Sequence, residues 1–154
     1  MSASAVLLKG EELEVARAEV GAVRDVVQDG SYREALDGLI ARLDDGEPLS
    51  GSQAEELDRV ITLALQSGRV RALYGPGGEQ AALRAFRKLP TGAELAATAG
   101  QVNDALASLA GRQLERVSVT AVGPGAFTLA IAADGAELSI RLDRQGARLA
   151  SVGL

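Results

Sequence analysis

The chain has 154 residues, carries a net charge of -5 at neutral pH, and contains neither cysteine nor histidine. This composition removes thiol nucleophiles, imidazole bases and the usual zinc and haem ligands from its possible chemistry. Apolar residues make up 47% of the chain but aromatic residues only 3%, which predicts an aliphatic core and argues against an aromatic platform for single-stranded nucleic acid.

The N-terminal residues do not have the pattern of a signal peptide. They carry no basic n-region, and their longest apolar run is the four residues 5–8, which is too short for a signal-peptide core. No stretch approaches the eighteen apolar residues of a membrane-spanning helix. The absence of cysteine fits a reducing compartment. We therefore expect a cytoplasmic protein that has no contact with a membrane.

The first part of the chain has the periodicity of short helices. Apolar residues recur at steps of three and four over 11–28, 31–43 and 52–67, which is typical of helices with one buried side. Two pairs of residues have the spacing of a capping box, and Gly68 has the position of a C-terminal cap. The two pairs are Ser31 with Glu34 and Ser52 with Glu55.

A basic segment joins this helical part to the rest of the chain. Val70 and Leu73 suggest a short extended piece, and the glycines and proline of residues 74–78 predict a loop. A fourth helix is expected over 79–89, because Pro90 disfavours helical geometry in the residue before it. Residues 1–90 therefore form a helical half of about four short helices, with a basic loop and helix at 69–89.

The charge of this segment differs in sign from that of the residues before it. Residues 67–90 carry five basic residues and one acidic residue, whereas residues 1–66 carry six basic and fourteen acidic residues. Three interpretations stay open: the segment neutralises acidic helices of its own chain, docks an acidic protein partner, or contacts a nucleic-acid backbone through helix 79–89. The acidic whole chain makes nucleic acid the weakest of the three. The predicted partner-binding residues here are Arg69, Arg71, Tyr74, Arg84, Arg87 and Lys88.

The period of the pattern changes to two after a fifth predicted helix. Thr91 and Glu94 have capping-box spacing, and an apolar stripe continues over 92–110. From residue 113 onward apolar and polar residues alternate in four runs separated by glycine-containing turns, the last run near 147–152. This pattern predicts a four-stranded antiparallel meander. We expect Leu95, Val102, Leu106 and Leu109 of the helix to be buried against Phe127, Leu129, Leu138 and Ile140 of the sheet.

The other face of this predicted sheet carries small uncharged residues. Thr128, Ala130 and Ala132 alternate with the apolar residues of the second strand. A sheet face in water usually carries longer polar residues, and small side chains let a second layer approach closely. We therefore add these three residues to the predicted partner-binding set, with cover by the N-terminal helices of the same chain as the alternative.

No motif in the sequence calls for catalysis or for a cofactor. The glycine-rich residues 75–78 lack the Gly-Lys-Ser/Thr ending of a phosphate-binding loop and are followed by Glu79. The carboxylates of 44–47 and of 11–14 lack the order of a calcium loop. We expect no cofactor and no metal, and interpret the carboxylates as solvated turn and helix-end residues.

These observations together predict an α+β fold: an N-terminal helical half followed by a helix packed on a C-terminal four-stranded antiparallel β-meander. Residues 1–90 and 91–154 are expected to form one compact unit. The function we expect is a non-catalytic protein-protein interaction or assembly module, as a homo-oligomer or as a subunit of a larger complex. A DNA-binding regulator that uses helix 79–89, and a small-molecule-binding or enzymatic domain without histidine and cysteine, are the alternatives.

Overall fold

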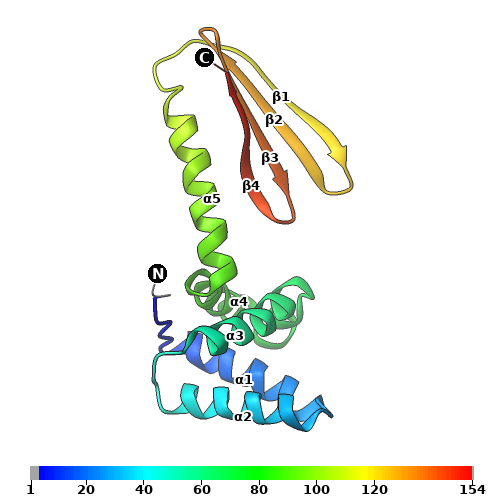
Figure 1. Cartoon of the computed structure of the whole chain (residues 1–154). Helices are drawn as coiled ribbons and strands as arrows, with labels where there is room; N and C mark the ends of the chain where they lie inside the picture. Colours follow the sequence, from blue (N-terminus) through cyan, green and yellow to red (C-terminus); the bar gives the residue numbers. More distant parts are fainter. Residues whose placement is uncertain (1–3, 154) are drawn as a thin grey trace. The chain divides into compact units, whose positions relative to one another are not determined.

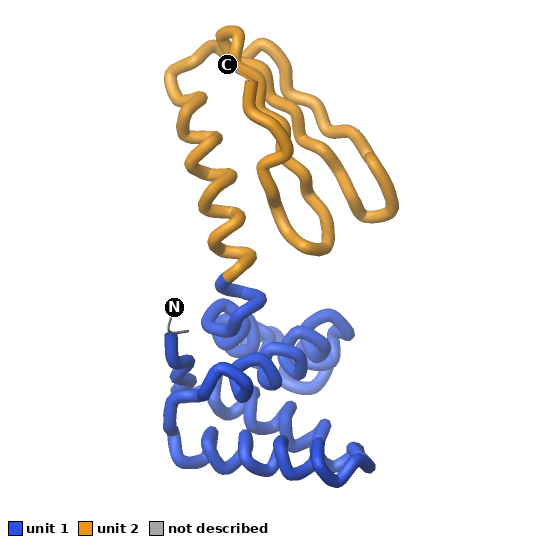
Figure 2. Tube along the Cα trace, viewed as in Figure 1, with its two compact units in different colours: residues 1–93 blue, residues 94–154 orange. Residues whose placement is uncertain are grey.

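The computed structural model describes residues 4–153 and contains five helices followed by a four-stranded antiparallel sheet (Figure 1), which confirms the predicted α+β class. The chain divides into two compact units, residues 1–93 and residues 94–154 (Figure 2). This boundary lies inside the fifth helix, three residues beyond the one that the sequence pattern places after residue 90.

The first unit is a bundle of four helices around an aliphatic core. Its helices are α1 (Glu11–Val26), α2 (Gly30–Asp44), α3 (Gly51–Gln66) and α4 (Arg69–Lys88). An isolated antiparallel bridge between Val6 and Leu49 holds the segment before α1 against the loop between α2 and α3. Among the described residues the core is aliphatic, as the composition predicts, and its largest buried apolar residues are Leu36, Leu39, Leu43, Leu57, Ile61 and Leu89.

The cap of α2 differs from the prediction. Asp29 precedes the helix, and its Oδ1 accepts hydrogen bonds from the backbone N–H of Tyr32 at 2.8 Å and from the Ser31 hydroxyl at 2.7 Å. The predicted capping box of Ser31 and Glu34 is therefore wrong, because the helix begins one residue before Ser31. An aspartate that can accept from the first turn is as good a cap as a serine.

The cap of α3 shows the same kind of shift, by two residues. Ser50 is the capping residue, and its backbone N–H donates to Oε1 of Gln53 at 3.1 Å, which completes a capping box. The predicted box of Ser52 and Glu55 is wrong, although Gly68, with φ 73°, ends the helix as predicted. Both registers have the required spacing, so spacing alone cannot choose between them.

The basic segment is helical over almost its whole length, which corrects two predictions. Val70 and Leu73 lie in helical turns rather than in an extended piece, and residues 74–78 are a kink rather than a loop. Only Gly75 leaves helical geometry, with φ 69° and ψ -170°. Pro76 then opens the next turn, where its fixed φ suits the first position of a helix.

The second unit consists of most of α5 and the sheet. Helix α5 spans Pro90–Ala107, and its first four residues belong to the first unit. Because α5 begins at Pro90, Thr91 lies inside its first turn and does not form the predicted capping box with Glu94. The strands are β1 (Leu114–Gly123), β2 (Ala126–Ala133), β3 (Ala136–Asp143) and β4 (Gly146–Gly153), paired in the order β1-β2-β3-β4. The predicted meander is confirmed.

Helix α5 packs on one face of this sheet, as the apolar stripe predicts. Val102 is buried with Leu138 and Ile140 of β3, and these three form the centre of the second unit's core. The residues packed around them are Ala105, Leu106, Leu109, Leu129, Ile131 and Ala147. No residue of β1 belongs to this cluster, so the helix covers the β2 to β4 side of the face.

Phe127 is a wrong prediction within this packing, since 42% of its surface is exposed. A helix with side chains is about 10–12 Å wide, whereas four strands at about 4.8 Å spacing present a wider face. One helix therefore cannot cover the whole apolar face, and the side chains beyond its reach stay accessible.

Candidate functional site

The basic helix α4 is joined to α1 through a buried carboxylate. Glu19 of α1 is only 2% exposed, and its two oxygens accept hydrogen bonds from Nε of Arg69 at 3.0 Å and from the Tyr74 hydroxyl at 2.7 Å. Burial raises the pKa of Tyr74 to about 12, and the hydrogen bond to Glu19 adds to the rise. Arg69 and Tyr74 are thus internal partners of Glu19.

The far end of α4 contacts the acidic start of α1. Lys88 Nζ lies 2.6 Å from Oε2 of Glu12, and the Arg84 guanidinium lies 3.2 Å from Oε2 of Glu11 and 3.7 Å from Oε1 of Glu12. A nucleic-acid phosphate or an acidic partner would have to displace these carboxylates to reach Arg84 and Lys88. The contacts favour the first of the three interpretations, in which the segment neutralises its own chain.

The two remaining arginines of α4 are more exposed. Arg71 faces Glu79 across the kink at 3.8 Å. Arg87 is exposed, and within residues 4–153 no carboxylate lies at ion-pair distance from it. Partner binding by the α4 residues stays a prediction, with Arg87 as the side chain that has most freedom to take part.

The face of the sheet opposite α5 mixes small and charged residues. The strand register sets Arg116, Ala132 and Glu137 in one row, and the Arg116 guanidinium lies 3.4 Å from Oε1 of Glu137. This ion pair spans Ala132, which is buried. Thr128 and Ala130 are half-buried between their neighbours. Small uncharged residues also lie beside them, since Ala130 is paired with Ser118 of β1 and Ser139 of β3. The role of Thr128, Ala130 and Ala132 in partner binding stays a prediction.

An uncovered apolar patch lies on the face that carries α5. The register places Val117 opposite Ile131 and Val119 opposite Leu129, so both valines share the face of the core. They are nevertheless 51% and 62% exposed, and Phe127 in the adjoining strand is exposed on the same face. We call Val117, Val119 and Phe127 the β1 patch.

Sequence reasoning missed the β1 patch because the alternation of apolar residues shows which face of the sheet is apolar but not how much of that face the helix covers. The width of the predicted elements could have revealed it, because the second half of the chain has four predicted strands and only one predicted helix to cover them. A helix spans about two strand spacings, so part of the face had to stay open at one edge or the other.

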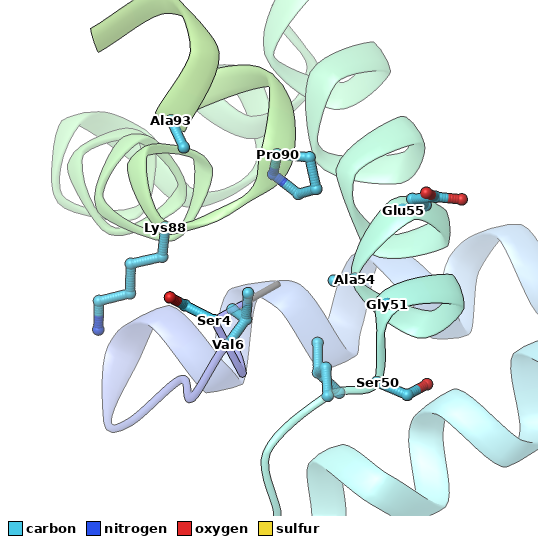
Figure 3. A pocket seen from close by; sticks show the side chains of 10 residues that line it. Ser4, Val6, Ser50, Gly51, Ala54, Glu55, Lys88, Pro90 and Ala93 are labelled. Carbon is cyan, nitrogen blue, oxygen red and sulfur yellow. The ribbon is translucent and has the colours of Figure 1, made fainter. Parts of the chain in front are cut away.

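The first unit contains a cavity of about 410 Å³ next to the start of α3 (Figure 3). Its walls are mainly apolar, and the polar residues that line it are Ser4, Ser50, Glu55 and Lys88. Figure 3 shows the Lys88 side chain extending away from Glu55 and Ser50. Its amine already contacts Glu12 and the Leu7 carbonyl oxygen, at 2.6 and 3.4 Å. No converging set of polar groups therefore marks this cavity as a ligand site.

Residues 4–153 contain neither a metal-binding cluster nor a membrane-spanning helix. Within that range no three acidic residues cluster closely enough to hold a metal ion. None of the helices described there is long and apolar enough to cross a membrane.

In comparisons with known proteins, no protein-family model, no curated protein and no solved structure matches the chain.

Proposed function

We propose that this chain is a non-catalytic cytoplasmic assembly module that associates with a second copy of itself through its C-terminal sheet. The single observation that carries the proposal is the β1 patch. Two valines and a phenylalanine at one edge of an open sheet are exposed although they share the face of the core. Contiguous exposed apolar surface on a folded domain commonly marks an interaction site.

The charge of the second unit supports self-association as the kind of contact. Residues 94–154 carry five basic and six acidic residues, so two copies of this unit repel each other only weakly. A partner of opposite charge has no large field to respond to here. Closed two-fold symmetry is the commonest arrangement of homo-oligomers, because one surface then serves both copies.

Sedimentation equilibrium of the wild-type chain and of two charge variants tests this function. Val117→Glu combined with Val119→Glu places carboxylates in the β1 patch, and Thr128→Glu with Ala130→Glu makes the same change on the opposite face of the neighbouring strand. We expect the wild type to self-associate, the first variant to be monomeric, and the second to behave as the wild type. A wild type that is monomeric throughout would contradict the proposed function.

A further inference from the structure

Strand β1 is an unusually open edge. It is ten residues long, where strands average about five or six, and all ten residues are exposed. Protein edges are normally protected by short length, proline, lysine or bulges. Leu114–Gly123 contains no proline and no lysine. Its pairing with β2 shifts register at Glu115 and at Val122, near the two ends of the strand, and is regular between them from Arg116 to Ala121.

The other edge of the sheet is less suited to pairing. In β4 the register shifts between the partners of Ser139 and Ile140, which leaves Ala150 without a partner residue. Such a bulge bends the strand and interrupts the row of backbone groups that another strand would need. Of the two edges seen in Figure 1, β1 thus offers the longer regular stretch.

The strand register fixes which backbone groups of β1 face outward. Asp134 and Gly135 form a two-residue hairpin turn, so Ala133 and Ala136 are a hydrogen-bonded pair. Alternation along the regular β2–β3 ladder then turns the even-numbered residues of β2 toward β1. Their partners are Arg116, Ser118 and Thr120, and it follows that Val117, Val119 and Ala121 direct their N–H and C=O groups to the free edge.

We propose that two copies of the chain pair through β1, antiparallel about a two-fold axis at Ser118, and so join their sheets into one eight-stranded sheet. This inference rests on the proposed self-association and specifies its contact. An axis perpendicular to the sheet keeps the apolar faces of both copies on the same side. Val117 of each copy then pairs with Val119 of the other, and the outward N–H and C=O groups bond across the axis.

The charges of β1 agree with this register. Glu115 and Arg116 are its only charged residues, and both lie near one end. An axis at either of them would set like charges opposite each other, which destabilises antiparallel pairs. With the axis at Ser118, Arg116 lies opposite Thr120 of the other copy, so no like charges meet.

The size of the contact sets the strength to expect. The five residues Arg116 to Thr120 pair across the axis and span roughly 17 Å at about 3.4 Å per residue. An edge of that length and about 10 Å depth buries roughly 350 Å² in total, less than the 1,200 Å² or more of stable complexes. The dimer is therefore weak and forms with rising concentration, with the valine pairs adding to the backbone hydrogen bonds.

Disulfide cross-linking tests the register. The chain has no cysteine of its own, so any disulfide that forms must involve the introduced residue. Ser118→Cys places two thiols at a non-hydrogen-bonded pair, where Cα atoms lie about 4.5 Å apart, a separation that a disulfide can bridge. Thr120→Cys is the matched control on the same face, and its two copies would be roughly 14 Å apart. We expect cross-linking of the first variant to be at least about tenfold faster.

A proline substitution tests the edge itself. The Val119 N–H points away from β2, so Val119→Pro removes no hydrogen bond of the β1–β2 ladder, as for prolines in natural edge strands. We expect a folded chain that no longer dimerises. Val119→Lys is the second variant and should give the same loss of mass without the backbone restriction of proline.

The outcomes separate this inference from the function on which it rests. A wild type of constant monomer mass in sedimentation would overturn both. A wild type that self-associates, together with equal cross-linking of the two cysteine variants and an unaltered mass for Val119→Pro, would overturn the β1 pairing alone. Stacking of the β1 patches face to face would give that second result, with a loss of mass only for Val119→Lys, which places a charge in the patch.

Discussion

Asp58 of α3 accepts two hydrogen bonds from Thr91 through one oxygen, from the backbone N–H at 2.8 Å and from the hydroxyl at 2.6 Å. Asp58 is buried, whereas Thr91 is exposed. The first turn of α5 thus takes its capping acceptor from an aspartate that lies 33 residues earlier in the chain.

Removal of this acceptor should destabilise the chain. Asp58→Ala leaves the N–H and hydroxyl of Thr91 without their partner, and we expect a cost of about 1–3 kcal/mol in the free energy of unfolding. Asp45→Ala, at an exposed aspartate just after α2, is the control and should change it by less than about 0.5 kcal/mol. Urea unfolding followed by circular dichroism measures both, and equal small effects would show that the cap is dispensable.

Truncation in the core of the second unit should cost more than truncation at its open edge. Leu138→Ala opens a cavity beneath α5, with an expected loss of about 2–5 kcal/mol. Leu114→Ala makes the same change at an exposed position of β1 and should cost less than about 0.5 kcal/mol. The comparison is made by urea unfolding at low protein concentration. Similar costs at the two sites would contradict the packing of α5 on β3.

The same glycine substitution should have opposite effects at two sites. Gly146 has φ 108°, and a Cβ there would lie 2.6 Å from Cδ2 of Leu95, so Gly146→Ala should destabilise by about 1–3 kcal/mol. Gly100 lies in α5 with open space around it, and Gly100→Ala should stabilise by about 0.5–1 kcal/mol. Melting temperatures of the two variants should shift in opposite directions, and a shift of the same sign would be the contrary result.

The stability of the first unit should fall at alkaline pH because of its tyrosines. The pKa of Tyr74 is raised to about 12 by burial and by Glu19, and that of Tyr32 is raised to about 12 mainly by its hydrogen bond to Glu56. Unfolded tyrosine loses its proton near pH 10. The tyrosine contribution is therefore complete below pH 10 and is lost as the pH rises toward 12.

Tyr74→Phe combined with Tyr32→Phe isolates this contribution. The variant lacks both hydroxyls, so its melting temperature should be lower than that of the wild type at pH 8 but should fall less between pH 10 and 12. Thermal unfolding across that pH range provides the measurement. Parallel pH profiles for the two proteins would show that the tyrosine hydroxyls do not contribute.

The periodicity of the sequence was sufficient to predict the order of the helices and strands, because each element buries one face and repeats its apolar residues accordingly. The turn at Asp134 and Gly135 was predictable because a two-residue hairpin turn needs positive φ at both positions, which Asp-Gly tolerates. Asp134 has φ 46° and Gly135 has φ 79°. Helix starts were less predictable. Asp29 and Ser50 each compete with a serine two positions later, Ser31 and Ser52, that has similar capping ability.

Long-range relationships could not be read from the sequence. Nothing in the spacing of residues 74–78 shows that a single left-handed glycine suffices to redirect the helix there. Nor does any local pattern pair Arg69 with Glu19, fifty residues apart, since that contact depends on how α1 and α4 pack. The β1 patch likewise depends on where one helix lies across four strands.

Amide hydrogen exchange at two protein concentrations, resolved by residue, tests the pairing of β1 most directly. The N–H groups of Val117, Val119 and Ala121 face the free edge, whereas those of Arg116, Ser118 and Thr120 are already bonded to β2. Pairing through β1 predicts that Val117 and Val119 exchange much more slowly at about 1 mM than at about 10 µM, a range in which a weak dimer forms. Unchanged exchange at those two residues in a sample that self-associates would contradict it.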